Sequence, residues 1–231
     1  MKPGYDFAET ALRCRALRRS APLIAALAAL LLPATGTSAT RILGSPHASP
    51  ERAQAWAAAQ GATPTFVRLA RLYWRLAPPR GIRPELAYAQ AAKETNFGRF
   101  TGVVDASFRN PCGLKRTAGG GNYDPRAHRR FRTWRQGVTA HLDHLALYAG
   151  ARGYPKRRTP DPRHFPFLHG RARTVQALGG AWAPSRRYGR EIVRMAREIG
   201  LRRPVKRRPA ARPVPRTFRK PAPHFAESAN L

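Results

Sequence analysis

Cysteine is scarce in this sequence: 231 residues include two, Cys14 and Cys112. Because Cys14 falls in a segment that we predict below to be a removable leader, the remaining chain has one thiol and no internal disulfide. A metal cluster held by several cysteines is excluded for the same reason. Cys112 stands beside Gly113, and we interpret it as a small packed residue rather than a reactive thiolate.

Acidic residues are also few, with 12 Asp and Glu against 43 Lys and Arg, so the formal net charge is +31. A chain this basic binds polyanions, either nucleic acid or an acidic surface. Any catalytic carboxylate between residues 40 and 201 must come from a short set: Glu51, Glu85, Glu94, Asp105, Asp124, Asp143, Asp161, Glu191 and Glu198. Four of these lie on ordinary helical stretches and are expected to be solvated: Glu51, Glu85, Glu191 and Glu198.

Long hydrophobic runs are absent except near the N-terminus, where residues 1–39 have the pattern of a secretion signal. Four arginines precede an almost unbroken apolar run from Ala21 to Leu32, and a small-residue cleavage site ends at Ala39. The run is shorter than the roughly 20 residues of a membrane-spanning helix, although an uncleaved anchor is the alternative. We expect a secreted or cell-wall-associated protein with no membrane span after signal cleavage. If the protein is exported, nucleic acid is excluded as its polyanionic partner.

The chain up to residue 201 predicts a mainly α fold with a small loop or β-ribbon lobe. We expect a short linker and a first helix within residues 40–62, then helices at about 63–77, 84–97, 135–148 and 187–199. Helix-start and helix-stop residues mark these boundaries, with Thr63-Pro64 and Pro84 at two starts and Gly98 and Gly150 at two ends.

Three stretches lack helical periodicity. Residues 99–131 contain a glycine turn and form the predicted lobe, and residues 151–173 form a Pro- and Arg-rich excursion. Residues 202–231 hold nine basic residues and six prolines, so they cannot bury a core and are expected to be disordered or extended. We predict that this basic tail binds anionic cell-wall polymers.

Glu94 is the candidate catalytic residue. It falls in the last turn of an Ala-rich helix, where the helix dipole is negative, and its neighbours on that face supply no cation. Both effects raise the pKa of a carboxyl group, and a glycosidase needs a proton donor that is still protonated when substrate arrives. An exposed helix glutamate without function is the alternative on position alone.

A partner for Glu94 is expected from the irregular lobe, where Asp105 and Asp124 lie. Asp124 follows Tyr123 just after the glycine turn, in a position to fold over a cleft, and we take it as the second catalytic residue. His141 and His144 are three apart on one helix but do not match His-Glu-x-x-His and have no evident third ligand. We interpret them as lining a polar groove and expect neither metal nor cofactor.

Three ordered blocks resemble one family. The stretch Ala89-Gln90-Ala91-Ala92-Lys93-Glu94-Thr95-Asn96-Phe97-Gly98 resembles the Ala-Gln-Ala-x-x-Glu-Thr-x-x-Gly signature of bacterial glucosaminidases, which are peptidoglycan hydrolases of glycoside hydrolase family 73 with a lysozyme-like fold. Asn110-Pro111-Cys112-Gly113-Leu114-Lys115 is similar to the Asn-x-x-Gly-Ile-Lys block of that family. Phe131-Arg132-Thr133-Trp134 resembles its Phe-Arg-x-Tyr block, and the match covers about residues 63–150.

We expect a catalytic domain over residues 63–201, and the resemblance implies that Glu94 is its general acid. It also implies that the glycan is bound by Gln90, Asn110, Tyr123, Trp134 and Tyr148. Two departures concern the substrate groove: Trp134 replaces the usual Tyr, and the glycine-rich lobe differs from the expected hairpin. Residues 151–201 lie outside the resemblance, and their aromatic side chains are expected to cap the core.

The resulting prediction is a monomeric endo-β-N-acetylglucosaminidase that cleaves β-1,4 glycosidic bonds of peptidoglycan. A lytic transglycosylase or a muramidase-type lysozyme would use the same glutamate and remains an alternative. A second alternative is a non-catalytic cationic protein that only binds the cell wall.

Overall fold

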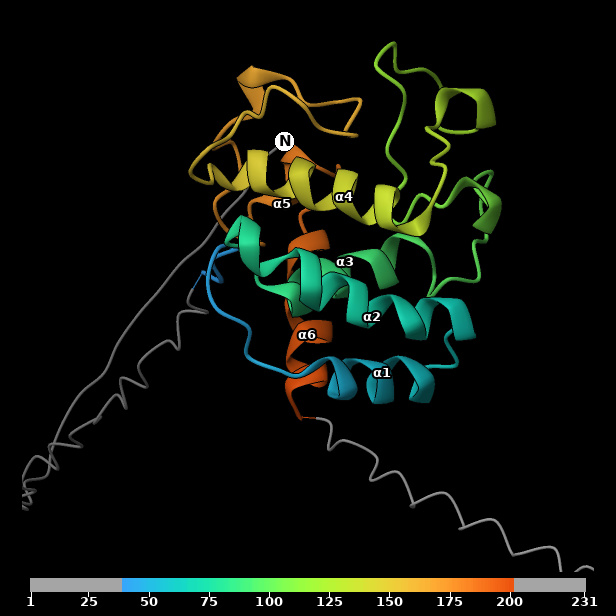
Figure 1. Ribbon diagram of the computed structural model, residues 1–231, viewed down its shortest axis with the longest axis vertical. Coiled ribbons are helices and arrows are strands. Elements are labelled where there is room, and N and C mark those ends of the chain that lie inside the picture. The colour runs from blue at the N-terminus through green and yellow to red at the C-terminus, as the bar shows by residue number, and fades with distance from the viewer. Residues whose placement is uncertain (1–38, 202–231) are drawn as a thin grey trace, which may run out of the picture. The chain divides into compact units, whose positions relative to one another are not determined.

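A computed structural model of the chain describes residues 39–201 (Figure 1). The predicted signal, except its last residue, and the predicted basic tail lie outside the described residues. The described part contains six α-helices: α1 (Pro50–Ala59), α2 (Pro64–Leu76), α3 (Pro84–Glu94), α4 (Trp134–Ala149), α5 (Leu178–Ala181) and α6 (Tyr188–Leu201). Short 3-10 turns lie between them: η1 (Pro78–Arg80), η2 (Ala106–Phe108), η3 (Pro125–Ala127) and η4 (Pro166–Leu168).

The helix boundaries follow local capping chemistry. Thr63 accepts a hydrogen bond from the Phe66 amide at the start of α2, and Thr133 does the same for Gln136 at the start of α4. Gly150 ends α4 in a left-handed conformation that a residue with a Cβ rarely adopts. The mainly α prediction is confirmed, and the backbone pairings between residues 39 and 201 are isolated bridges, including Lys115 with His128 in the lobe.

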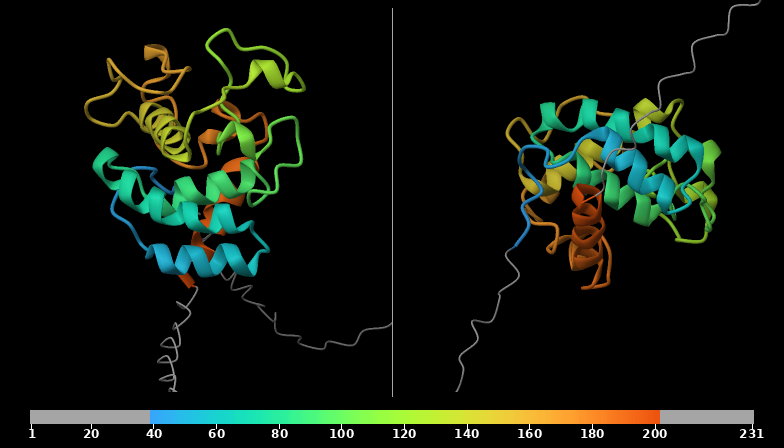
Figure 2. Two further views of the ribbon diagram at one scale, coloured as in Figure 1. Left: turned by 45° about the vertical axis from the view of Figure 1, so that its right-hand side comes forward. Right: turned by 90° about the horizontal axis from the view of Figure 1, so that it is seen from below.

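Helix α3 runs through the core. Every residue from Pro84 to Ala92 is buried, and the many alanines let neighbouring helices approach closely. Helices α2 and α6 both pack against α3, and α1 packs against α2. Figures 1 and 2 show α6 crossing the other helices. The core includes the aromatic side chains of Trp56, Phe66, Tyr73 and Tyr88.

The predicted linker belongs to the same compact unit as the helices. Ile42 is fully buried, and backbone hydrogen bonds join it to Arg83 and to Arg173. Trp56 of α1 is also fully buried and donates its indole N–H to Glu198 of α6. Residues 40–62 are therefore part of the folded domain rather than an appendage before residue 63, because their apolar side chains complete the core.

Two irregular segments stand on the same side of α4 (Figures 1 and 2). One is the lobe of residues 99–131, and the other is the excursion of residues 151–173. A small second core of Cys112, Leu114, Phe131 and Ala140 connects the lobe to α4. Cys112 is buried, which confirms its packing role, and burial raises the pKa of its thiol. No helix between residues 39 and 201 is long and apolar enough to cross a membrane.

Candidate active site

Glu94 is the last residue of α3 and lines a groove of about 480 Å³. The groove receives side chains from the lobe, from α4, from the excursion and from the segment before α6. Its other lining residues are Cys112, Gly113, Leu114, Lys115, Asn122, His128, His144, Tyr148, Arg163, Phe165, Phe167, Leu168, Ala181, Trp182, Ala183 and Pro184. A smaller hollow of about 190 Å³ on the lobe side also includes Glu94.

A tight turn immediately after Glu94 ends the helix at this point. Thr95 donates its hydroxyl to the Ala91 carbonyl and accepts from the Gly98 amide. Gly98 has φ +80°, and a Cβ there would lie 2.5 Å from Thr63 Oγ1 and 2.7 Å from Phe66 Cβ. The glycine of the sequence motif is therefore required by both conformation and space, and it fixes where Glu94 emerges from the core.

Glu94 is accessible to the groove and is nevertheless closely surrounded by protein atoms. The residue as a whole is exposed, yet its carboxyl group lines the groove and is closely surrounded by Tyr188, Lys93 and Trp182. Burial among these atoms raises the pKa of Glu94, and hydrogen bonding from Tyr188, the charge of Lys93 and the Trp182 side chain partly oppose it. The carboxyl is thus biased toward its protonated form.

Tyr188 is the side chain that contacts the Glu94 carboxylate directly. It is the first residue of α6 and is buried, and its hydroxyl donates a hydrogen bond to Glu94 Oε1. The Tyr188 oxygen in turn accepts a hydrogen bond from Gln90 Nε2 at 2.9 Å. Nothing in the spacing of the sequence indicates a contact between Tyr188 and Glu94, because 94 residues separate the two.

Aromatic side chains form the wall of the groove next to Glu94. The Trp182 ring lies 5.0 Å from the His144 ring and 5.7 Å from the Tyr148 ring, measured between centroids. The Tyr148 hydroxyl donates to the Ala181 carbonyl at 3.2 Å, which joins α4 to the segment before α6. Of the aromatic residues beyond position 150, Phe165, Phe167 and Trp182 line the groove, and Trp182 also packs against the core.

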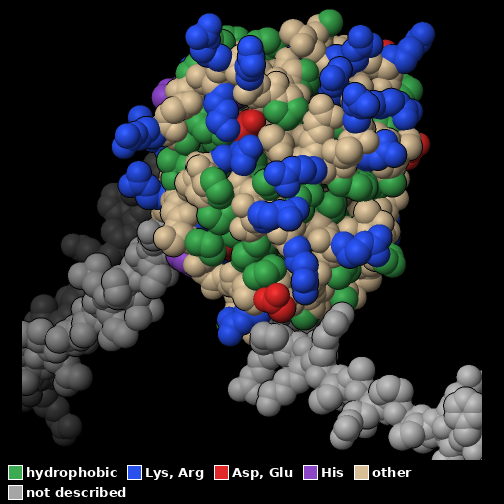
Figure 3. Space-filling model, viewed as in Figure 1, with side chains coloured by type: hydrophobic (Ala, Val, Ile, Leu, Met, Phe, Trp, Pro, Cys, Tyr) green, Lys and Arg blue, Asp and Glu red, His purple; other side chains and the backbone are tan. Residues whose placement is uncertain are grey.

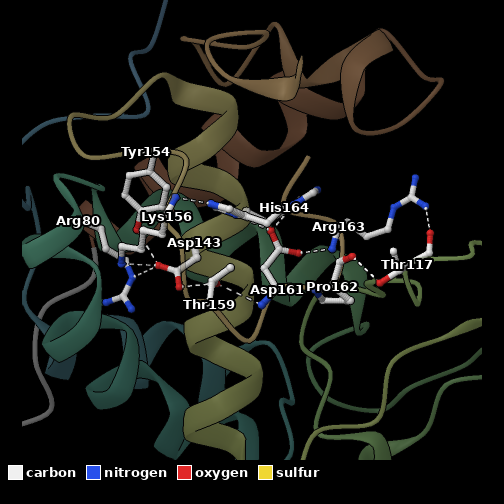
Figure 4. A network of polar contacts seen from close by, with 11 residues as sticks. Arg80, Thr117, Asp143, Tyr154, Lys156, Thr159, Asp161, Pro162, Arg163 and His164 are labelled. Carbon is white, nitrogen blue, oxygen red and sulfur yellow. Dashed lines mark hydrogen bonds and ion pairs between the residues drawn. The ribbon is translucent and has the colours of Figure 1, made fainter. Parts of the chain in front are cut away.

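A further part of the groove lining comes from the excursion, which a polar network holds on α4 (Figure 4). Asp143 accepts hydrogen bonds from Arg80, Tyr154, Lys156 and Thr159 at 2.6 to 2.9 Å. The donors lie in η1 and at the start of the excursion. Asp143 itself is buried, with 1 % of its surface exposed. Asp143 therefore fixes the path of the excursion over α4.

A second buried carboxylate, Asp161, continues this network. It binds the Nδ1 atoms of His144 and His164 at 2.8 and 3.0 Å. Pro162 and Arg163 of the excursion contact the lobe. The Thr117 hydroxyl donates to the Pro162 carbonyl, and the Arg163 side chain donates to the Thr117 carbonyl. The lobe and the excursion are thus joined by hydrogen bonds (Figure 4).

Two of the residues predicted to bind substrate, Gln90 and Asn110, are buried, and Asn110 also lines the smaller hollow that includes Glu94. Gln90 is 1 % exposed and lies between Tyr188 and His141, so it acts on the site through Tyr188. Asn110 is fully buried, and its side-chain amide bonds the backbone of Leu114 and Arg129. It shapes the loop that carries Gly113 and Leu114 to the groove, since a buried amide needs partners for all its polar atoms.

The structure places the three predicted aromatic contacts differently. Tyr148 lines the groove with Glu94. Tyr123 lies on the lobe and is 91 % exposed, next to the groove-lining Asn122. Trp134 begins α4 and lines a separate hollow with Thr95 and Phe100, so it does not line the groove that holds Glu94.

The two acids of the lobe, Asp124 and Asp105, accept hydrogen bonds from residues close to them in sequence. Asp124 is exposed and accepts from the Arg126 amide at 2.9 Å as the N-cap of η3. Asp105 caps η2 in the same way, and its hydrogen bonds with Ser107 lower its pKa. Neither lines the groove, and among the described residues that do, Glu94 is the only acid.

Two corrections concern acids and histidines read from the sequence. Glu85, expected to be solvated, is buried beside Arg83 at 2.8 Å, because α3 is enclosed on every side. His144 lines the groove as predicted, but His141 is fully enclosed in the core. Between residues 39 and 201 no three His, Cys, Asp or Glu side chains are grouped to hold a metal ion.

The groove can therefore supply one proton donor, an aromatic wall and several polar side chains. A carboxyl with a raised pKa, open to solvent on one side and hydrogen-bonded on the other, is suited to protonate a leaving oxygen. Cationic side chains at the rim, including Lys115 and Arg163, favour an anionic polymer. Figure 3 shows that Lys and Arg are spread over the viewed face, with few acids among them.

Comparison with known proteins identifies one family. The sequence model of the family "Glucosaminidase: Mannosyl-glycoprotein endo-beta-N-acetylglucosaminidase" matches residues 70–201, which is more than half of the chain. An uncharacterized protein of Borreliella burgdorferi is 29 % identical over 121 residues, which are 52 % of this chain and 55 % of that protein. The chain thus matches little more than half the length of this relative. No solved structure matches the chain.

Proposed function

The chain belongs to the glucosaminidase family, and from that premise we propose that it is an exported peptidoglycan hydrolase with Glu94 as its general acid. In this proposal it acts as an endo-β-N-acetylglucosaminidase on β-1,4 bonds of the glycan strand. The observation that carries the proposal is the placement of one carboxyl with a raised pKa, Glu94, in the lining of an aromatic-walled groove. The predicted signal in residues 1–39 supports action outside the cytoplasm.

The first chemical step is protonation of the glycosidic oxygen by Glu94 while the bond from that oxygen to C1 breaks. Burial keeps the proton on Glu94, and Tyr188 holds the second carboxyl oxygen. Trp182 and Tyr148 offer flat apolar surfaces on which a pyranose ring can stack. The carboxylate that remains is stabilised by the Tyr188 hydrogen bond and by Lys93.

The group that completes the reaction is the second part of the proposal. Because no second carboxylate lines the groove within the described residues, we favour attack on C1 by the carbonyl oxygen of the substrate's own N-acetyl group. Water then opens the resulting ring and returns a proton to Glu94. Asp124 stays a prediction for this role, and Asp124→Asn separates the two routes: the N-acetyl route predicts that most activity is retained.

The bond that is cut is tested by mass spectrometry of products from purified peptidoglycan. Our proposal predicts glycan fragments that end in reducing N-acetylglucosamine. Fragments that end in anhydro-N-acetylmuramic acid would assign the protein as a lytic transglycosylase, and reducing N-acetylmuramic acid would assign a muramidase. If the wall is bound but yields no fragments, the protein is a cationic wall-binding protein instead.

A further inference from the structure

A chain of buried hydrogen bonds extends from Glu94 into the core beyond Tyr188. Gln90 Oε1 lies 3.2 Å from His141 Nε2, and His141 Nδ1 lies 2.8 Å from the Tyr73 hydroxyl. Helices α6, α3, α4 and α2 supply the successive members: Tyr188, Gln90, His141 and Tyr73. His141 and Tyr73 are fully buried, and Gln90 is 1 % exposed.

In this series of hydrogen bonds each group has a defined role as donor or acceptor when Glu94 is ionised. A carboxylate can only accept hydrogen bonds, so the Tyr188 hydroxyl donates its single proton to Glu94. The Tyr188 oxygen then accepts a hydrogen bond from Gln90 Nε2. The other end of the Gln90 amide is then an oxygen, which requires a proton on His141 Nε2. A neutral imidazole with that proton has an acceptor at Nδ1, which receives the Tyr73 hydroxyl.

His141 is neutral because no solvent and no ion pair supports its charge. Burial lowers its pKa to about 3, with the nearby His144 acting in the same direction and Asp161 opposing it. The other titratable groups around this series of hydrogen bonds are Lys93 and Cys112 near Glu94, and Tyr88 and Cys112 near Tyr73. A neutral ring has one N–H, and its position decides which way the Gln90 amide faces.

We propose that His141, held by Tyr73, is a positioning residue that orients the Gln90 amide and so keeps Tyr188 donating to Glu94. If the amide turned over, its oxygen would face Tyr188 and compete with Glu94 for the hydroxyl proton. The N–H of His141 disfavours that orientation, because it would then face the amide N–H₂ of Gln90. The catalytic carboxyl thus has one oxygen held by Tyr188 and the other free to carry the proton toward the groove.

The proposal rests on the role given above to Glu94, but its test does not require hydrolysis. The pKa of the Glu94 side chain is measured by ¹³C NMR titration of the full-length protein, with the resonance assigned by its loss in Glu94→Gln. His141→Leu should raise this pKa, because Tyr188 then donates partly to Gln90. His141→Gln, whose amide N–H can reach Gln90 Oε1, should restore it. Tyr73→Phe should raise it less.

Tyr88→Phe is the matched control. Tyr88 is also a fully buried residue of the same core, and its hydroxyl donates to the Phe66 carbonyl, outside the chain that reaches Glu94. This variant should leave the pKa of Glu94 unchanged even if it lowers the melting temperature. If His141→Leu does not fold, Tyr73→Phe alone tests the proposal, because it removes the hydroxyl that contacts His141 and keeps the aromatic ring.

Kinetics give a second readout. Losing this one buried hydrogen bond should lower kcat by about threefold to tenfold with KM little changed. An unchanged pKa of Glu94 in both His141→Leu and Tyr73→Phe would overturn the proposal and leave His141 as a packing residue. A wild-type protein that cleaves no glycan would refute the proposed function instead, while the titration still decides the role of His141.

Discussion

At the scale of single residues, the site depends on how Glu94 is surrounded. Sequence reasoning singles out Glu94 as a candidate because the end of its helix and its small neighbours are local features. It does not find the contact of Tyr188 with Glu94 or the hydrogen bonds that bury Gln90 and Asn110, because these join residues that are separated in sequence. Burial of an amide or a carboxylate depends on the whole fold and leaves no mark in the spacing.

The pH dependence of activity is the first prediction at this scale. A general acid must be protonated, and the protonated fraction of Glu94 falls as pH rises through its folded-state pKa. Since burial raises that pKa, kcat/KM should decline on an alkaline limb above the ordinary glutamate value of about 4.3. A pH–rate profile of muropeptide release checks this. A limb at the ordinary value would mean that Glu94 is not desolvated or not the acid.

The stability of Glu94→Gln is the second prediction at this scale. A carboxyl whose folded pKa is raised contributes stability that is complete below its unfolded pKa and is lost as pH rises through the folded pKa. Gln keeps the acceptor for Tyr188 and removes the charge. At pH 7 the variant should melt at a temperature equal to or above that of the wild type, and the difference should shrink in acid. A lower melting temperature at pH 7 would contradict this reading of the site.

At the scale of elements, turns and loops place the groove around the helix end. The sequence predicts the helix starts and stops well, because Thr63, Pro64, Pro84 and Gly150 act through local capping and backbone preference. It leaves the excursion undescribed, because the hydrogen bonds from Asp143 and Asp161 that hold it join distant segments and have no periodic pattern.

Gly98→Ala tests the turn after Glu94. A Cβ at φ +80° would be strained and would meet Thr63 and Phe66, so unfolding free energy should fall by about 1–3 kcal/mol, and activity should drop as Glu94 shifts. Gly102→Ala is the matched control, because nothing lies within 4 Å of its Cβ. Chemical denaturation of both variants measures the difference. Equal stability would show that the turn tolerates a side chain.

Asp143→Ala tests how the excursion is held. Several donors lose their partner, of which Lys156 and Arg80 are partly solvated, so we expect a loss of about 2–3 kcal/mol. Trypsin should then cut faster at Arg157 and Arg158 than in the wild type. Unchanged cleavage there would mean that other contacts hold the segment.

The pH dependence of the same network has the opposite sign from that of Glu94. Burial opposes ionisation of Asp143, but hydrogen bonds from Tyr154, Lys156 and Thr159 outweigh it, so its pKa is lowered. Its contribution to stability is present above the unfolded pKa and is lost as pH falls through the folded pKa. The free energy of unfolding measured by chemical denaturation should therefore fall in acid in the wild type, and the fall should be smaller in Asp143→Ala, where Asp161 still has a lowered pKa.

At the scale of the whole molecule, the charge of +31 governs the encounter with substrate. Lys and Arg are spread over the viewed face of the described part (Figure 3), and residues 202–231 add nine basic residues. An anionic wall should attract such a chain, and dissolved salt should screen the attraction. Composition alone predicts this property, because it depends on the sum of the charges more than on their positions.

The contribution of the C-terminal segment to wall binding is testable by truncation. Removing residues 202–231 should weaken sedimentation with purified cell walls and flatten its dependence on salt, while hydrolysis of soluble glycan fragments stays the same. An unchanged salt response would exclude this segment as an electrostatic anchor.

The measurement that tests the central claim most directly compares wild type and Glu94→Gln on purified peptidoglycan. The rate of turbidity loss should fall by about 10²- to 10⁴-fold, the range for removal of a general acid, while the variant still sediments with the wall and melts at or above the wild-type temperature. Hydrolysis at a wild-type rate by folded Glu94→Gln would contradict the assignment of Glu94 as the proton donor.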